Sequence, residues 1–132
     1  MMTENKGGKD RMGKHVLLIE DEPNIIEAIS YILRQDGWVV STHSDGMKAV
    51  DRVLEIAPDL VILDVMLPGR SGFEILQDIR ASEQTETLPV LMLTARGQNK
   101  DRLAAESFGA SHYMTKPFSN QEMLNAVREL MA

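Results

Sequence analysis

A short apolar run that ends in an acid limits the folds open to this chain. Residues 61–63 are Val-Ile-Leu, and a continuous run with β-branched residues is typical of a strand buried on both faces of a parallel sheet. Pro58 precedes the run and Pro68-Gly69 follow it, marking its two ends. Asp64 therefore lies at the carboxyl end of a strand, where open parallel sheets bind their ligands. Taken alone, this stretch fits a ligand site and an ordinary loop aspartate equally well.

Similar apolar runs recur along the chain and alternate with segments of helical periodicity. Further strands are predicted at Val16–Glu20, Trp38–Thr42, Pro89–Thr94 and Ala110–Thr115. Strands and helices that alternate in this way predict an α/β fold. We expect a doubly wound five-stranded parallel sheet, with right-handed crossovers that place helices on both faces.

Start signals place five helices between and after these strands. Pro23 opens the first helix, and Ser44 or Asp45 caps the second. Capping boxes start the third and fifth, formed by Ser71 with Glu74 and by Ser119 with Glu122. The fourth helix is placed near Asn99–Phe108 and offers few apolar residues for burial. Because an apolar face holds most helices in place, the fourth is predicted to be the most weakly anchored.

Length and charge narrow the class of protein. The 132 residues, of which 43% are hydrophobic, fit one compact domain with its own core. Residues 1–14 are polar and aperiodic, so we expect a flexible tail followed by a domain over 15–132. A net charge of -6 argues against direct binding of nucleic acid. The sequence has no membrane-length apolar segment and no signal-peptide core, so we expect a cytoplasmic protein without a membrane partner.

Side chains of complementary chemistry follow four of the predicted strands. Glu20 ends the first and Asp21 follows it, Asp64 ends the third, Thr94 ends the fourth and Lys116 follows the fifth. The carboxyl ends of parallel strands share one edge of the sheet, so these residues are expected to meet there. Carboxylate oxygens suit Mg²⁺, which offsets repulsion between the acids and an incoming phosphoryl group. Lys116 can pair with phosphoryl oxygens, and the Thr94 hydroxyl can donate a hydrogen bond to one.

Each of these residues has an ordinary explanation when it is considered by itself. Acidic residues at 20–22, before Pro23, are favoured by the helix dipole and can serve as caps. Lys116 can be a solvated loop charge, and Tyr113 can be a packing residue. The joint site is favoured because these residue types converge on one edge in the order that phosphoryl transfer requires.

The motifs at these strand ends resemble those of the receiver domains of two-component response regulators. The matching segments are Leu-Ile-Glu20-Asp21-Glu22-Pro, Leu-Asp64-Val-Met-Leu-Pro-Gly, Met-Leu-Thr94-Ala95-Arg and Tyr113-Met-Thr-Lys116-Pro117-Phe, within a similarity that runs from about His15 to Met131. The resemblance implies a flavodoxin-like fold with strand order 2-1-3-4-5. It also implies a cis peptide bond between Lys116 and Pro117.

The resemblance further implies that Asp64 is the phosphoacceptor. A histidine kinase or a histidine phosphotransfer protein would supply the phosphoryl group in a Mg²⁺-dependent reaction. Asp21, Asp64 and the backbone carbonyl of Met66 would ligate Mg²⁺, and Glu20 would act through water. A protein of this kind catalyses its own phosphorylation and dephosphorylation and is not a conventional turnover enzyme.

A switch follows from the same resemblance. Thr94 and Lys116 would contact the phosphoryl group, and movement of Thr94 would leave space into which Tyr113 can rotate. The surface of the fourth helix, fifth strand and fifth helix would then bind a downstream protein, in a monomer or a phosphorylation-dependent dimer. Ser111-His112 stand where many DNA-binding relatives carry two aspartates, which argues against their charge-paired dimer.

Three alternatives bear on the output and the chemistry. The chain ends at Ala132, close to the last predicted helix, which fits either a stand-alone receiver or part of a longer, for example DNA-binding, regulator. The start of the sequence, with its own tail, favours the stand-alone receiver. A phosphatase of the haloacid dehalogenase type would also use Asp64 as nucleophile, but it needs an aspartate where Met66 stands. A receiver that works without phosphate is disfavoured by the complete set of site residues.

Overall fold

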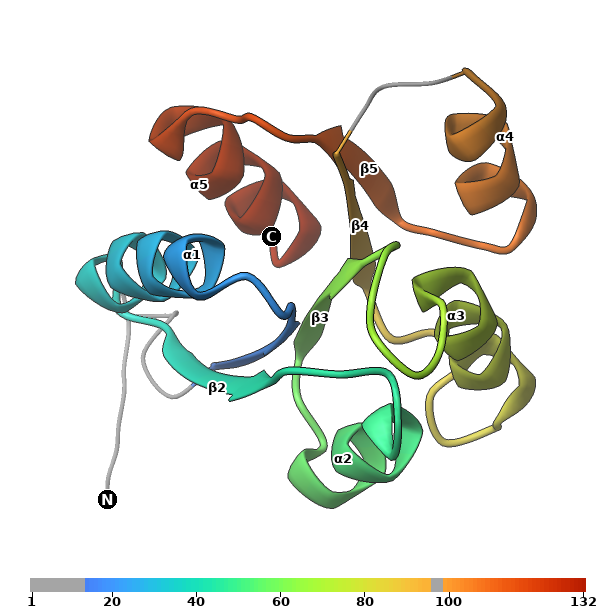
Figure 1. Cartoon of the computed structure of the whole chain (residues 1–132). Coiled ribbons are helices and arrows are strands. Elements are labelled where there is room, and N and C mark those ends of the chain that lie inside the picture. Colours follow the sequence, from blue (N-terminus) through green and yellow to red (C-terminus); the bar gives the residue numbers. More distant parts are fainter. Residues whose placement is uncertain (1–13, 96–98) are drawn as a thin grey trace, which may run out of the picture.

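The computed structural model describes residues 14–95 and 99–132 as a single sheet with helices on both faces (Figure 1). Its elements are β1 (His15–Ile19), α1 (Pro23–Gln35), β2 (Val39–His43), α2 (Ala49–Ile56), β3 (Leu60–Asp64), α3 (Gly72–Ala81), β4 (Val90–Thr94), α4 (Asn99–Ser107), β5 (His112–Thr115) and α5 (Asn120–Leu130). All neighbouring strands are parallel, in the order β2-β1-β3-β4-β5. The predicted fold class and strand order are confirmed.

The sheet separates two apolar clusters, one on each face. The first packs against α1 and α5, and the second against α2, α3 and α4 (Figure 1). Within β3, Leu60 and Ile62 belong to the first cluster while Val61 and Leu63 belong to the second, as the two-residue period of a strand requires. Every residue of β3 is buried, so the apolar run that ends at Asp64 is a central strand, as predicted.

Strand boundaries differ slightly from the sequence prediction, because helix ends take some of the backbone amides. The N–H of Trp38 donates to a carbonyl in the last turn of α1, so β2 begins one residue later than predicted. The N–H of Ala110 likewise donates to the carbonyl of Ala105 in α4, and β5 begins only at His112. β1 lies one residue earlier than predicted, and β4 begins one residue later, after Pro89.

The predicted start of α2 is wrong. Neither Ser44 nor Asp45 caps the helix, which begins at Ala49 after Lys48 in a left-handed conformation with φ of 61°. The Asp45 carboxylate instead accepts a hydrogen bond from the backbone two residues later. The N–H of Gly46 donates to the loop after β3, and a side chain at this glycine would overlap that loop. This tertiary contact holds the connection in a loop and delays the helix.

Both predicted capping boxes are present. The Ser71 hydroxyl accepts from the N–H of Glu74, whose carboxylate accepts from the N–H of Ser71. Ser119 and Glu122 form the same pair of contacts at the start of α5. These local interactions fix where the two helices begin, and α3 thereby returns the chain directly beside the end of β3.

Asp36 joins the end of α1 to α5 and to a buried indole. The Arg128 guanidinium donates to its carboxylate at 2.6 and 3.1 Å, and the indole N–H of Trp38 donates at 3.1 Å. Trp38 is 3% exposed and lies just before β2, at the edge of the sheet where the strands begin. Asp64 lies at the other edge, where they end.

The predicted tail over 1–14 lies outside the described residues, apart from Lys14. The carbonyl of Lys14 accepts a hydrogen bond from the N–H of Val39, so the pairing of β1 with β2 extends one residue before β1. None of the helices in residues 14–95 and 99–132 has both the length and the apolar character that a membrane span requires.

Candidate functional site

Residues that follow different strands meet at one edge of the sheet. β1 and β3 are neighbours, so Glu20 and Asp21, which follow β1, lie beside Asp64 at the end of β3. Thr94 ends β4, which adjoins β3, and Lys116 follows β5 on the far side of β4. The chain leaves β1 toward β2 and leaves β3 toward β4, so the strand order reverses here, as at the ligand sites of other doubly wound sheets.

The three carboxylates form a compact acidic cluster. Oxygens of Glu20, Asp21 and Asp64 all lie within 4.8 Å of one another. Glu20 is fully buried and Asp64 is 3% exposed, whereas Asp21 is exposed to solvent. Buried acids in mutual contact are costly unless a cation accompanies them. The donor set, hard oxygens with one side open to solvent, fits Mg²⁺, which takes one or two carboxylates and keeps several waters.

Burial and charge both act on Asp64. Desolvation, together with the negative charge of Glu20, raises the pKa of Asp64 to about 7, although Lys116 and the N–H of Met66 act in the opposite direction. Without a metal ion, the carboxylate is therefore held partly protonated near neutral pH. A divalent cation favours the charged form, so binding of the cation and release of the proton are linked.

The raised pKa gives the metal-free protein a definite pH dependence. Between the ordinary value of 3.8 and about 7, the folded protein keeps a proton on Asp64 that the unfolded chain has lost. Its free energy of unfolding therefore falls as the pH rises through this range. In chelator, Asp64→Asn is expected to be more stable than wild type at about pH 8, by on the order of a few kcal/mol, and this difference should shrink toward about pH 5.

Urea titrations of both proteins followed by circular dichroism measure this difference. Asp51→Asn, at an exposed position in the first turn of α2, is the matched control and should follow the wild-type pH profile. Parallel profiles for wild type and Asp64→Asn would contradict the burial of a proton at Asp64.

Lys116 neutralises the cluster from one side. Its Nζ atom lies 3.1 Å from Glu20 Oε1, 3.0 Å from Glu22 Oε1 and 3.5 Å from Asp64 Oδ2. Burial alone would lower the pKa of Lys116, but its contacts with Glu22, Asp64 and Glu20 outweigh burial and raise it. The peptide bond between Lys116 and Pro117 is cis, as the sequence resemblance implies.

The contact between Glu22 and Lys116 was not predicted from sequence. Glu22 occupies the N-cap position of α1, where the capping interpretation expects its side chain to bind backbone N–H groups. Its carboxylate makes no cap hydrogen bond and reaches Lys116 instead. Two residues that are 94 positions apart in the sequence meet only because β1 and β5 end at the same edge, so no local signal could have indicated the pair.

The loop after β3 turns tightly around Asp64. The N–H of Met66 donates to Asp64 Oδ1 at 3.4 Å, while the Met66 side chain is 72% exposed. The N–H of Gly72, at the start of α3, donates to the carbonyl of Val65 at 2.9 Å. A Cβ atom at Gly72 would overlap the carbonyl oxygen of Asp64. Glycine therefore allows α3 to begin directly against the strand end that carries the acid.

Thr94 and Tyr113 lie on adjoining strands. Thr94 is 3% exposed, and the Tyr113 hydroxyl is buried without a hydrogen-bond partner among the described residues. Burial raises the pKa of Tyr113, and the Thr94 side chain counters part of this rise without a well-aligned hydrogen bond. An unpaired buried hydroxyl costs free energy, so this side chain gains a partner if it moves.

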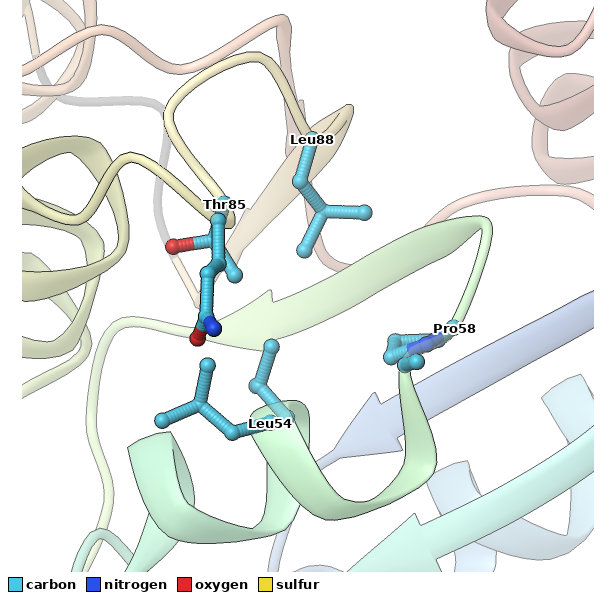
Figure 2. A pocket seen from close by; sticks show the side chains of 7 residues that line it. Leu54, Pro58, Thr85 and Leu88 are labelled. Carbon is cyan, nitrogen blue, oxygen red and sulfur yellow. The ribbon is translucent and has the colours of Figure 1, made fainter.

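A cavity of about 340 Å³ lies away from the acidic cluster. Figure 2 shows Leu54 and Pro58, from the end of α2 and the residues after it, facing Thr85 and Leu88 of the loop between α3 and β4. Pro58 and Leu88 precede β3 and β4, so the cavity belongs to the edge where strands begin and takes no part in the site at their ends.

The family model of the response regulator receiver domain matches residues 16–128. The chain therefore belongs to the response regulator receiver domain family. Receiver domains are signalling proteins of two-component systems and not conventional enzymes. They bind Mg²⁺ at an acidic site, and Glu20, Asp21 and Asp64 form an acidic cluster in this chain.

Two curated relatives illustrate the match. The DNA-binding dual master transcriptional regulator RpaA of Synechocystis sp. is 42% identical over 116 residues, which are 88% of this chain and 48% of that protein. The phosphate regulon transcriptional regulatory protein PhoB of Escherichia coli is 38% identical over 120 residues, 91% of this chain and 52% of that protein. The chain thus spans about half the length of the curated relatives that it matches.

Solved structures share the whole fold. The receiver domain of the sensor histidine kinase PA1611 from Pseudomonas aeruginosa has a TM-score of 0.83 at 30% identity, covers 91% of this chain and 99% of that chain, and has a magnesium ion coordinated in its active site cleft. The chemotaxis response regulator CheY4 of Vibrio cholerae has a TM-score of 0.83 at 28% identity, covering 89% of this chain and 98% of that chain.

Proposed function

We propose that this chain is a phosphorylation-dependent signalling switch in which Asp64 accepts the phosphoryl group. The observation that supports this most directly is the contact of Lys116 with Asp64, 3.5 Å apart, within the acidic cluster of Glu20, Asp21 and Asp64. A nucleophilic carboxylate, a cation for the phosphoryl oxygens and oxygens for a metal ion are together at one strand edge. The phosphodonor is a histidine kinase or a histidine phosphotransfer protein.

In the proposed transfer, a carboxylate oxygen of Asp64 attacks the phosphorus of a phosphohistidine on the partner. A P–O bond forms as the P–N bond breaks, and the imidazole leaves with the electron pair of that bond and takes a proton from solvent. The signal is lost by hydrolysis: water attacks the same phosphorus, and the O–P bond of the acyl phosphate breaks. Asp64 then regains its carboxylate, and inorganic phosphate is released.

The metal ion and the lysine have separate roles in this proposal. Asp21, Asp64 and the carbonyl of Met66 would hold Mg²⁺, and Glu20 would act through water. When bound, Mg²⁺ offsets the repulsion between the acids and the phosphoryl group. Lys116 exchanges a carboxylate partner for a phosphoryl oxygen, which is a charge-assisted contact of the same kind.

Thr94 and Tyr113 couple the site to the surface. The Thr94 hydroxyl donates to a phosphoryl oxygen and moves toward it, and Tyr113 turns into the space that Thr94 leaves. The buried hydroxyl of Tyr113, which has no hydrogen-bond partner among the described residues, supports this step, because rotation to the surface would let it bind water. The surface formed by α4, β5 and α5 then binds a downstream protein.

The partner of this domain is a protein. The net charge of -6 disfavours direct contact with nucleic acid, even though the relatives RpaA and PhoB are named as transcriptional regulators. We propose a cytoplasmic domain that works as a monomer or as a phosphorylation-dependent dimer. The phosphatase alternative is not favoured, because Met66 occupies the position of its general acid.

Intact mass spectrometry tests the proposed function. Wild-type protein incubated with phosphoramidate is expected to gain one phosphoryl group when Mg²⁺ is present and none in chelator, because the metal ion is needed to bring an anion to the acids. Loss of the added mass over time in Mg²⁺ measures self-catalysed dephosphorylation. No gain of mass in Mg²⁺, or an equal gain in chelator, would contradict the proposal.

A further inference from the structure

Arg80, near the end of α3, contacts three segments that are separate in the sequence. Its Nε atom donates to the carbonyl of Gly109 at 2.9 Å, and Nη1 donates to the carbonyl of Thr85 at 3.4 Å. Nη2 donates to Ser111 Oγ at 3.4 Å, and that hydroxyl also accepts from the N–H of Val90 at 3.0 Å. One planar guanidinium thus links the end of α3, the loop before β4 and the loop between α4 and β5.

The Gly109 contact falls at the C-terminal end of α4. The N–H of Gly109 donates to the carbonyl of Glu106, and the N–H of Ala110 donates to that of Ala105, which is a Schellman motif with glycine in the left-handed conformation, φ 96°. A Cβ atom at Gly109 would lie 3.2 Å from Arg80 Nε. The helix end and the arginine therefore fit closely, and a cation there is favoured by the helix dipole.

A ring contact reinforces the same end. Phe108 packs edge-on against Phe73 of α3, with ring centroids 5.7 Å apart. Toward the other end of α4, Leu103 is 56% exposed, and of the described side chains at 100–107 only Ala105 is buried. Apolar contacts and charge-assisted hydrogen bonds are thus concentrated where α4 ends, and the remainder of the helix has little to hold it in one place.

We infer that Arg80 is a positioning residue that fixes the C-terminal end of α4 to α3, so that α4 moves by pivoting about Gly109. The fixed end can be tested in the unphosphorylated protein. The pivot rests on the proposed function, because phosphorylation of Asp64 supplies the change that acts on α4 through Tyr113. Tyr113 packs against the same apolar cluster that contains Ala105 of α4, so a displacement of its ring changes the packing on which α4 rests.

The Arg80 guanidinium is a planar fork of N–H donors, and this shape, not the charge alone, accounts for its three contacts. Guanidinium groups donate several hydrogen bonds in a fixed plane, whereas an ammonium group is a single compact centre on a flexible stem. The side chain is partly buried, and burial lowers the pKa of Arg80. Hydrogen bonds from a desolvated cation are among the stronger ones in proteins.

Amide hydrogen exchange by NMR in Arg80→Met measures the fixed end. Methionine keeps most of the apolar stem and loses every donor. We expect the amides of Phe108, Gly109 and Ala110 to exchange about tenfold faster than in wild type, with β1 and β3 unchanged. Arg52→Met is the matched control, because among the described residues the Arg52 side chain pairs only with the exposed Glu55, and it should match wild type throughout.

Two further variants guard against an unstable Arg80→Met protein. Arg80→Lys keeps the charge without the fork, so it should resemble Arg80→Met at these amides; full protection in the lysine variant would overturn the role of the fork. Ser111→Ala removes one acceptor of Arg80 and also the acceptor of the Val90 N–H, so it should give a smaller increase at 109–111 together with faster exchange at Val90. Unchanged exchange at Gly109 in both Arg80→Met and Arg80→Lys would overturn the inference.

Addition of phosphoramidate and Mg²⁺ tests the pivot. In wild type, exchange should change at 100–104 and stay constant at 108–110, whereas in Arg80→Met it should change along the whole helix. The rate of phosphorylation should be equal in the two proteins, because Arg80 lies away from Asp64. A change at 108–110 in wild type would overturn the pivot. If neither protein gains mass, the proposed function fails, while the exchange of the unphosphorylated proteins still decides whether Arg80 fixes the helix end.

Discussion

Asp64→Asn is expected to abolish the Mg²⁺-dependent gain of a phosphoryl group from phosphoramidate. The amide has nearly the shape of the carboxylate, but its oxygen is a poor nucleophile and cannot form the acyl phosphate. Asp64 is 3% exposed and held by the N–H of Met66 and by Lys116, so an isosteric change should leave the fold intact. Intact mass after incubation with the donor measures the effect, which should be a complete loss of the added mass.

Two controls make this result specific. Asp51→Asn, on the exposed face of α2, should be phosphorylated like wild type. Asp64→Asn should have the circular dichroism spectrum of wild type, so that loss of modification cannot be attributed to unfolding. Modification of Asp64→Asn at the wild-type level would show that another residue is the acceptor, and peptide mapping would then identify it.

Gly72→Ala is expected to destabilise the protein strongly, although alanine is the better helix former. Helix propensity alone predicts a gain of up to about 1 kcal/mol. The added Cβ would overlap the carbonyl oxygen of Asp64 and approach Val65, and backbone atoms of a central strand cannot move aside easily. Relieving the overlap should cost about 3 kcal/mol or more, seen as a lower urea midpoint by circular dichroism.

Gly37→Ala is a control that distinguishes the steric overlap at Gly72 from the cost of placing alanine in a left-handed backbone conformation. Gly37 ends α1 with φ of 96°, so alanine there should cost roughly 1 kcal/mol for the left-handed conformation. The loss at Gly72 should clearly exceed that at Gly37. An equal or smaller loss at Gly72 would contradict the tight packing of α3 against the end of β3. A folded Gly72→Ala protein should also be phosphorylated more slowly, because relief of the overlap displaces Asp64.

Features that depend on neighbouring residues in the chain could be predicted. The capping boxes at Ser71 and Ser119 each need only residues three positions apart, and both are present. The buried strand that ends at Asp64 follows from its continuous apolar run. The meeting of Glu20, Asp21 and Asp64 follows from one further rule, that parallel strands end at a common edge.

Features set by contacts between distant segments could not be predicted. Asp45 has the residue type of a cap, but the packing of Gly46 against the loop after β3 keeps this connection out of the helix. The side chain of Glu22 was interpreted as a local cap and instead contacts Lys116. No pattern in the sequence indicated the contacts of Arg80, because its partners lie up to 31 positions away and two of its three acceptors are backbone carbonyls.

The placement of Trp38 has a practical consequence for spectroscopy. It is the only tryptophan in the sequence, and its buried indole is tied to Asp36 at the edge of the sheet remote from Asp64. Its fluorescence should therefore report unfolding of the domain with the same amplitude whether or not the acidic site is occupied. Because a ligand that binds only the folded state raises the unfolding midpoint, this one emission signal can measure the affinity for Mg²⁺ or a phosphoryl analogue directly from the shift.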